Sequence, residues 1–235
     1  NADGVMGVFP ADHLFQDEKP WKDAVQTALE FAADSDQLVT IGLEPESSSP
    51  SYGYLHLGGL LTSTGKSPVY KVNRFVEKPT VEAAQTYLDS GEYLWNTGTF
   101  AWKVATLMRG FQQHLPGHYH GFQQIMANPD SWDVLAKEYP SLENISIDYG
   151  LMERSSNIAV VKANFERIDL GNLLNLSDLL EGSGRSKWSK DDFGNSHLGN
   201  GLIVSSSNTL IYDDTNEGIT IAFGLDDVIL IRQKD

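Results

Sequence analysis

Glu77 and Lys78 stand side by side at the end of the apolar run in NRFVEKPT, and Pro79 follows them. Taken alone, such a pair is most often a solvated surface ion pair. Here proline bars a further ladder hydrogen bond and the next helix begins only at Thr80, so both side chains should mark the end of a strand. A carboxylate can accept hydrogen bonds from two sugar hydroxyls, and a lysine is a compact cation for phosphate. The pair therefore suits a sugar phosphate.

Two aspartates each allow a structural and a metal-binding interpretation. Asp12 ends the first apolar run, in GVFPADH, and Asp169 ends a later one, in IDLGN. Either can cap the helix that follows it. Either can equally be a hard oxygen ligand for Mg²⁺ at the carboxyl edge of an α/β sheet, where the ligands of such folds collect. We expect Glu77 and Lys78 to lie at the same edge as Asp12.

Asn96 in WNTG carries an amide that both donates and accepts hydrogen bonds, between an aromatic ring and a glycine that permits close backbone approach. A bulge or a turn explains the same residues equally well. Gly53, between two tyrosines, is either part of a plain turn and strand or a backbone contact to a ligand with stacking walls. His118 and His120 in GHYHG have no third ligand nearby, which favours an ordinary loop over a metal site.

The composition of the chain limits its partners. Its 235 residues include 32 acidic and 17 basic side chains, a formal net charge of −15. Such a charge repels nucleic acid and the anionic face of a membrane, so we expect neither as a partner. The absence of cysteine rules out disulfides and thiolate nucleophiles, and no stretch has the pattern of a membrane span or a signal peptide. These features suit a cytoplasmic protein.

The apolar periodicity predicts an α/β domain that would position these residues. A buried strand in DGVMGVFPADH, a helix in PWKDAVQTALEFAADS and a strand in QLVTIGL form a β-α-β unit. Two strands, YGYLHLGG and VYKVNRFVEKP, precede a helix with Thr80 as its N-cap and Gly91 just past its end. The strand-like YLWNTGTFAWKV leads into helical segments over about 103–139. IDYGLMER predicts a short helix, and IAVVKANFERIDLGN a pair of strands.

The C-terminal part differs in its predicted secondary structure. LLNLSDLLEG predicts a helix that ends at Gly182, and the polar residues 183–200 predict a linker. Four short strand patterns then follow from Gly201: GLIVSSS, TLIYDD, GITIAFG and DDVILIR. We therefore expect an α/β domain over 3–182, a linker over 183–200 and a small all-β segment over 201–235. No long internal repeat is evident.

Taken in order, six short motifs resemble the sugar-phosphate nucleotidyltransferases, and among them most closely the mannose-1-phosphate guanylyltransferases. The motifs are FPADH, YGYLHLG, FVEKP, WNTGTF, IDYGLME and IDLGN. The match covers most of residues 5–180 and continues weakly into the β-rich tail. Six motifs in the right order are more specific than any one of them. The resemblance implies a Rossmann-like mixed sheet of the glycosyltransferase-A kind, with flanking helices.

The resemblance also implies a reaction. A phosphate oxygen of mannose 1-phosphate would attack the α-phosphorus of GTP, pyrophosphate would leave, and GDP-mannose would form in the presence of Mg²⁺. Such a transfer needs positioning and charge neutralisation more than a covalent protein group. By resemblance, Asp12 and Asp169 would hold Mg²⁺, and Lys78 would act with them as a catalytic cation.

The same resemblance implies the residues that bind the substrate. Glu77 would hold the sugar hydroxyls and Lys78 the sugar phosphate. Asn96 and Thr97 would orient the sugar, and Gly53 would offer a backbone contact.

The chain also departs from this family. The family opens with a Gly-rich loop of the form GGxGTRLxPLS, which is not found here, and Arg167 stands where a tryptophan is usual. We therefore expect an incomplete, N-terminally truncated domain that is weakly active or inactive alone. Its exposed sheet edge should favour association, including a possible homodimer. Two alternatives stay open: another sugar-1-phosphate nucleotidyltransferase that uses a different base, and a non-catalytic binding or assembly module.

Overall fold

The computed structural model describes residues 3–15, 18–169, 190–215 and 217–234, and these residues form two compact units. The first unit comprises the chain up to Ala11 together with Phe15–Glu166. The second comprises Asp12–Leu14 and the chain from Arg167 onward. Within the described ranges, no helix has both the length and the apolar character that crossing a bilayer requires.

A six-stranded mixed sheet in the order β1-β6-β3-β7-β5-β4 forms the centre of the first unit. Strand β3 runs parallel to β7, whereas β6 is antiparallel to β1, β3 and β4, and β5 is antiparallel to β4 and β7. The expected α/β class with a mixed sheet and flanking helices is confirmed. The strands are β1 (Val5–Val8), β3 (Leu38–Leu43), β4 (Tyr54–Thr62), β5 (Val69–Val76), β6 (Tyr93–Lys103) and β7 (Ile158–Ala163).

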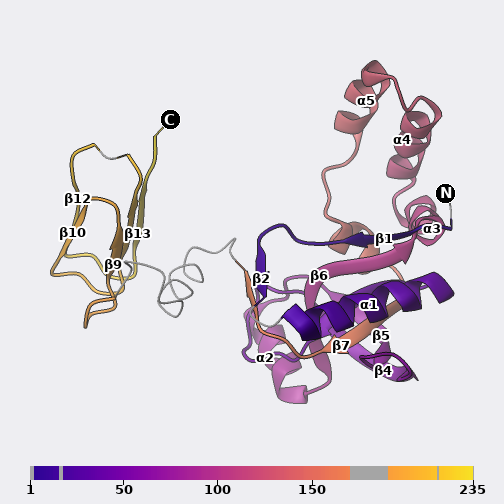
Figure 1. Ribbon diagram of the computed structural model, residues 1–235, viewed down its shortest axis with the longest axis horizontal. Coiled ribbons are helices and arrows are strands. Elements are labelled where there is room, and N and C mark those ends of the chain that lie inside the picture. Colours follow the sequence, from indigo (N-terminus) through magenta and orange to yellow (C-terminus); the bar gives the residue numbers. More distant parts are fainter. Residues whose placement is uncertain (1–2, 16–17, 170–189, 216, 235) are drawn as a thin grey trace. The chain divides into compact units, whose positions relative to one another are not determined.

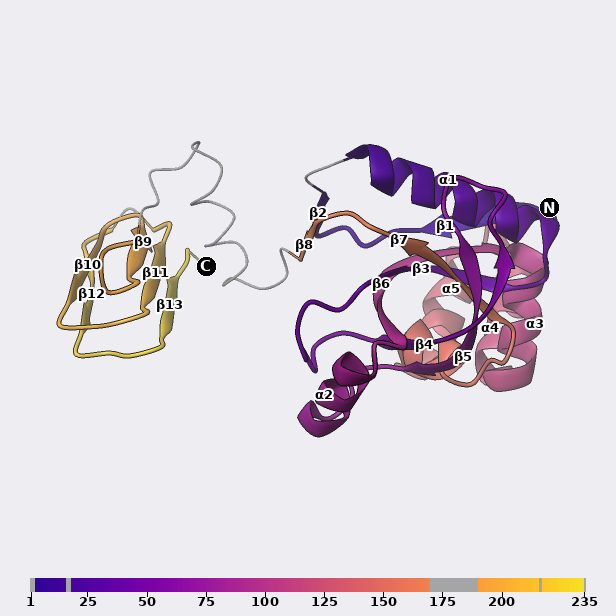
Figure 2. The ribbon, with the colours of Figure 1, turned by 90° about the horizontal axis from the view of Figure 1, so that it is seen from below.

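Helices cover both faces of this sheet, as Figures 1 and 2 show. One face carries helix α1, whose buried alanines share a core with Val39 and Ile41 of β3. On the opposite face, helix α3 and the π-helical turn η2 share a second core with Leu38 of the same strand. Neighbouring residues of β3 thus belong to cores on opposite faces, as the alternation along a strand requires. The bounds are α1 (Glu18–Asp34), α3 (Val104–His114) and η2 (Asp148–Met152).

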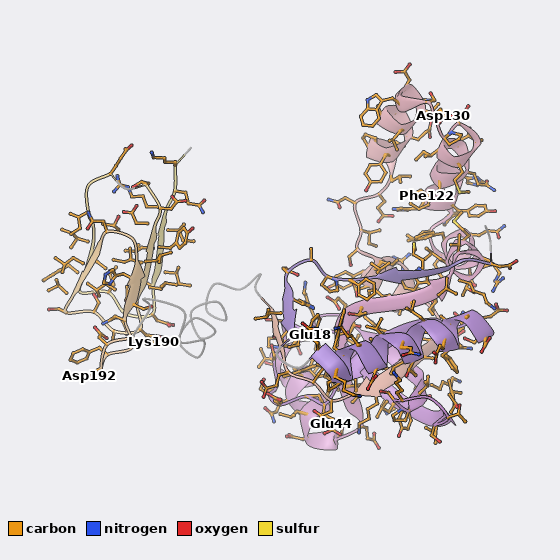
Figure 3. All side chains as sticks on the ribbon, viewed as in Figure 1. Glu18, Glu44, Phe122, Asp130, Lys190 and Asp192 are labelled. Carbon is orange, nitrogen blue, oxygen red and sulfur yellow. The ribbon has the colours of Figure 1, made fainter. Side chains whose placement is uncertain are left out.

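Helices α4 and α5 follow α3 and extend away from the sheet (Figure 1). The ring of Phe122 in α4, labelled in Figure 3, lies 5.3 Å from the ring of Phe111 in α3. His118 and His120 lie within α4, so the loop predicted for them is wrong. The bounds are α4 (Pro116–Ala127), α5 (Trp132–Glu138) and the 3₁₀ turn η1 (Tyr139–Ser141).

Helix α2 (Val81–Ser90) begins and ends where the sequence predicts. Thr80 is its N-cap, and the Thr80 hydroxyl accepts a hydrogen bond from the Ala83 N–H at 3.3 Å. Gly91 ends the helix in the left-handed conformation, with φ at 67°. The helix therefore starts directly after the Glu77-Lys78-Pro79 segment.

The first strand lies at an edge of the sheet, so the prediction of a buried strand there is wrong. Strand β1 is the outermost strand beside β6, and its Met6 and Val8 are 36% and 37% exposed. Strand β5 is antiparallel to β7, so it also runs opposite to β1. The argument from strand direction that placed Glu77 and Asp12 at one edge of the sheet is therefore wrong.

The second unit contains a coil of short parallel strands. Strand β10 pairs with β12 and β11 with β13, and the partners are nineteen residues apart, as Gly201 with Thr220 and Leu210 with Ile229. The spacing over β10 to β13 is thus nineteen residues, whereas β9 and β11 pair at fourteen residues, as Ser196 with Leu210. The expectation of no long repeat missed the nineteen-residue spacing. In Figure 2, β10 and β12 form one side of the coil, and β9, β11 and β13 form the other. The bounds are β9 (Ser196–Leu198), β10 (Gly201–Val204), β11 (Leu210–Asp213), β12 (Thr220–Phe223) and β13 (Ile229–Arg232).

The other C-terminal predictions have mixed outcomes. The four strand patterns from Gly201 are confirmed as β10 to β13. Strand β9 lies within the predicted linker over 183–200, of which the structure describes the residues from 190 onward. The helix predicted to end at Gly182 lies outside the described residues. The predicted strand pair after Ile158 gives β7 and the short β8 (Arg167–Asp169), and β8 pairs with β2 (His13–Phe15).

Candidate functional site

Gly53, Glu77 and Asn96 meet where three strands run side by side. At its first residue, Tyr54, strand β4 pairs with the end of β5 on one side and with β6 on the other. The Asn96 N–H donates to the Gly53 carbonyl at 2.8 Å. A Cβ atom at Gly53 would lie 2.5 Å from Glu77 Oε2 and 3.3 Å from Asn96 Cβ. Only glycine therefore leaves room for the Glu77 carboxylate at this point.

The backbone around Lys78 fixes the position of Glu77. Lys78 has a φ of 45°, in the left-handed region that residues with a Cβ rarely adopt. The Glu77 N–H donates to Glu153 Oε1 at 2.6 Å, and Pro79 fixes the φ angle that follows Lys78. Lys78 Nζ lies 3.7 Å from Glu77 Oε1, and the two side chains are 58% and 10% exposed. The segment therefore presents a largely buried carboxylate beside an accessible ammonium group.

Two acidic side chains without a role predicted from the sequence complete this arrangement. They are Asp148, the first residue of η2, and Glu153, which directly follows η2. Asn96 Nδ2 donates to Asp148 Oδ1 at 3.3 Å. The signal for both was the IDYGLMER motif, in which the buried residues of η2 stand between the two acids. The Glu77 cluster is the name used below for Gly53, Glu77, Lys78, Asn96, Asp148 and Glu153.

Burial raises the pKa of two acids of the Glu77 cluster, Glu77 and Asp148. Burial first, and then the negative charge of Asp148, raise the pKa of Glu77 to about 7, while Lys78 opposes this shift and Glu153 adds to it. Burial likewise raises the pKa of Asp148, against hydrogen bonds and the Lys78 charge that lower it. A carboxyl group that changes protonation near neutral pH can both donate to and accept from hydroxyl groups. The cluster therefore suits a ligand with several hydroxyls.

The residues next to Asn96 hold the strands together. Thr97 is 1% exposed and its hydroxyl donates to the Ile41 carbonyl at 2.9 Å, which joins β6 to β3. The role predicted for Thr97 in orienting a sugar stays a prediction. On the other side of Asn96, the Trp95 ring lies 4.9 Å from the ring of Tyr52. Tyr52 is next to Gly53 in the sequence, and Trp95 is next to Asn96.

The two predicted metal ligands belong to the second compact unit. Asp12 is exposed and lies in a bend before β2, and Asp169 is the last residue of β8. In the part of the chain that the structure describes, no three histidine or acidic side chains are grouped to hold a metal ion. Mg²⁺ is usually held by only one or two carboxylates together with substrate phosphates and water. The donor types therefore fit Mg²⁺, and the metal site stays a prediction.

Sequence comparison links this chain to enzymes that act on sugar phosphates. Residues 1–138 match the model of a protein family described as nucleotidyl transferase. The mannose-1-phosphate guanylyltransferase ManC of Salmonella typhimurium is 29% identical over 100% of this chain. A mannose-1-phosphate guanylyltransferase of Klebsiella pneumoniae is 31% identical over 99% of it. The chain covers 48% of each of these proteins, so it spans about half the length of the curated relatives that it matches.

Two solved structures have the same fold. A mannose-1-phosphate geranyltransferase of Thermus thermophilus superimposes with a TM-score of 0.72 and 30% sequence identity, over 98% of this chain and 63% of that one. A mannose-6-phosphate isomerase of Helicobacter pylori superimposes with a TM-score of 0.60 and 26% identity, over 71% of this chain and 64% of that one.

Proposed function

Because this chain belongs to the nucleotidyl transferase family, we propose that it takes part in guanylyl transfer to mannose 1-phosphate. A phosphate oxygen of mannose 1-phosphate forms a bond to the α-phosphorus of GTP, and the bond from that phosphorus to the pyrophosphate oxygen breaks. The products are GDP-mannose and pyrophosphate. The names of the relatives support this choice of sugar and base.

The observation that carries the proposal is the placement of Glu77 against Gly53 and Asn96, with Lys78 beside it. In the proposed complex, the Glu77 carboxylate accepts hydrogen bonds from sugar hydroxyls, and the Asn96 amide binds another hydroxyl. Lys78 is accessible and carries the positive charge that the phosphate requires. The opposite exposures of Glu77 and Lys78 match a ligand with a neutral ring and an anionic group.

Mg²⁺ is part of the proposal, with Asp12 and Asp169 as the carboxylates that would hold it. When bound, the ion would neutralise phosphate charge during the transfer. The roles of Glu77, Asn96 and Lys78 in binding the sugar phosphate do not depend on the ion.

The test is calorimetric titration of the full chain with mannose 1-phosphate, alongside methyl mannoside, mannose 6-phosphate and glucose 1-phosphate. Lys78→Met should weaken binding of mannose 1-phosphate about 10- to 100-fold, the loss typical of a hydrogen bond between charged groups. It should leave binding of the uncharged methyl mannoside unchanged. Lys71→Met, at an exposed position of β5, is the matched control. Equal effects of the two variants on mannose 1-phosphate would contradict the role of Lys78.

Pyrophosphate release with GTP, with and without Mg²⁺, tests the transfer itself. Because the chain is expected to be weakly active at most, the expected result is slow release that requires mannose 1-phosphate and stops when EDTA removes the ion. Binding of mannose 1-phosphate without release, under any metal condition, would support a binding module instead. Tighter binding of glucose 1-phosphate, or release with another nucleoside triphosphate only, would identify a different nucleotidyltransferase.

A further inference from the structure

The side-chain amide of Asn96 is held on both sides by groups from other elements. Thr40 in β3 is fully buried, and its hydroxyl lies 2.7 Å from Asn96 Oδ1. Asp148 in η2 holds the other side, with its Oδ1 3.3 Å from Asn96 Nδ2. The three residues lie far apart in the sequence, so the fold itself brings this chain of hydrogen bonds together.

The two partners differ in the amide orientation that they permit. A hydroxyl can donate or accept a hydrogen bond, whereas a carboxylate can only accept one. The Asp148 carboxylate therefore requires the nitrogen of the Asn96 amide on its side, and the amide oxygen must face Thr40. A half-turn of the amide would bring its oxygen against the carboxylate, so that two acceptors would meet without a proton between them.

Thr40 fixes the oxygen end of the amide. Its hydroxyl carries one proton and has two acceptors within reach, Asn96 Oδ1 at 2.7 Å and the Thr99 carbonyl at 3.0 Å. The contact with Asn96 is the shorter one. A valine in place of Thr40 would keep the shape of the side chain but remove the proton, which would leave one side of the amide without its partner.

We propose that Thr40 and Asp148 are positioning residues that hold the Asn96 amide in one orientation, so that it presents one N–H and one oxygen lone pair to a sugar hydroxyl. Neither residue needs to touch the sugar. A hydroxyl both donates and accepts, so an amide fixed in advance binds it without first losing rotational freedom. This inference rests on the proposed function, because it takes Asn96 as a contact to the sugar.

Four substitutions in the full chain test the proposal. Thr40→Val removes the hydroxyl, and Thr40→Ser keeps it. Asp148→Asn replaces a pure acceptor with an amide that can also donate, so it no longer imposes one orientation on Asn96. Thr27→Val is the matched control, because Thr27 is also buried, in α1, and its hydroxyl donates only to a backbone carbonyl, that of Asp23 at 2.9 Å.

Two measurements are made on each variant. The first is the pair of side-chain N–H signals of Asn96 in the nitrogen–proton NMR spectrum, identified by its loss in Asn96→Asp. The second is the Kd for mannose 1-phosphate by calorimetry. Thr40→Val and Asp148→Asn should both shift the Asn96 signals. Thr40→Val should raise the Kd about 3- to 10-fold, as expected for the loss of one neutral hydrogen bond. Thr40→Ser and Thr27→Val should match the wild type in both measurements.

The outcomes separate this proposal from the proposed function. If the wild type does not bind mannose 1-phosphate but Thr40→Val and Asp148→Asn still shift the Asn96 signals, the positioning role stands and the proposed function fails. If the wild type binds and neither variant changes the signals or the Kd, the positioning role is overturned and the proposed function stands. Should Thr40→Val not fold, Asp148→Asn decides the same question by itself.

Discussion

Gly53 is the residue whose change should most directly affect the Glu77 cluster. Gly53→Ala would place a methyl group 2.5 Å from Glu77 Oε2, so the carboxylate must move. We expect at least a ~10-fold loss of affinity for mannose 1-phosphate and a loss of about 1–3 kcal/mol in the free energy of unfolding, as for other overpacked sites. Calorimetry and urea titration measure the two effects. Gly59→Ala in β4 is the control, because a Cβ at Gly59 meets no atom within 4 Å.

The raised pKa of Glu77 predicts how stability depends on pH. Folding raises this pKa from the ordinary 4.5 to about 7. Between these values the folded chain keeps a proton that the unfolded chain has lost, so the contribution of Glu77 to the free energy of unfolding is full below about pH 4.5 and falls as the pH rises toward 7. The stability of the wild type relative to Glu77→Gln should fall over this range, by at most ~1.4 kcal/mol per pH unit.

Urea titrations of both proteins between pH 5 and 8 measure this difference. Glu46→Gln, at an exposed position, makes the same chemical change and should give a difference that does not vary in this way. A relative stability of the wild type that rose with pH would contradict the prediction.

At this scale the sequence singled out residues with a local pattern and missed those whose contacts depend on distant parts of the chain. Glu77 and Lys78 follow an apolar run that Pro79 ends, and Asn96 was singled out by the WNTG motif although it lies within strand β6. Thr40 was missed because its strand has the pattern of a continuous apolar run. The pairing of β3 with β6 brings Thr40 to Asn96. Asp148 lies in the IDYGLMER motif, but the motif does not show that its carboxylate reaches Asn96, which is 52 residues away in the sequence.

At the scale of elements, the cap of α2 offers a test of stability that leaves binding unchanged. Thr80→Ala removes the hydrogen bond to the Ala83 N–H and should lower the free energy of unfolding by about 1 kcal/mol. Affinity for mannose 1-phosphate should stay the same, because the Glu77 N–H is held by Glu153 and not by the helix. Urea titration and calorimetry measure the two quantities.

Thr80→Ser keeps the capping oxygen and should retain most of the stability. A loss of affinity in Thr80→Ala as large as in Gly53→Ala would mean that α2 positions the Glu77 cluster, contrary to this expectation.

The ends of α2 were predictable because capping is a local matter of a few neighbouring residues. The place of β1 was not, because a short apolar run reads the same in the middle of a sheet and at its edge. The direction of β5 was not predictable either. Its run before Glu77 fits a parallel strand as well as the hairpin with β4 that the chain adopts.

At the scale of the whole molecule, Asp213 should stabilise the second unit without affecting the first. Its side chain is 1% exposed and accepts hydrogen bonds from Thr220 Oγ1 at 2.6 Å, from Thr215 Oγ1 at 2.7 Å and from the Thr215 N–H at 3.0 Å. Led by the bond from Thr220, these hold the pKa of Asp213 at about 2. The stabilisation is thus present above the ordinary pKa of 3.8 and is lost as the pH falls toward 2.

Asp213→Asn should therefore speed hydrogen exchange in β11 and β13 at neutral pH, because an amide cannot accept all these bonds. The amides of β3 and β7 should keep their wild-type rates, since they belong to the other compact unit. Asp214→Asn, at the exposed neighbouring position, is the control. Equal acceleration in both units would show that their stabilities are coupled.

The nineteen-residue spacing in the second unit was missed because the paired positions of successive turns are alike in being apolar but are not identical residues. The pairs Leu202 with Ile221 and Val204 with Phe223 match in being apolar, and Gly201 with Thr220 does not match at all. The sequence showed each strand separately. Which strands pair, and at what spacing, is seen only in the structure.

Over β10 to β13, the spacing of nineteen residues means that the coil changes in length by whole turns. Each turn contacts only its neighbours, so stability grows by increments as turns are added. Removal of one whole turn takes one strand from each side and leaves the remaining strands in register. A change of one residue within a strand would instead exchange its inward and outward positions. This part of the molecule can therefore become longer or shorter in whole turns, while a strand inside it tolerates no smaller step.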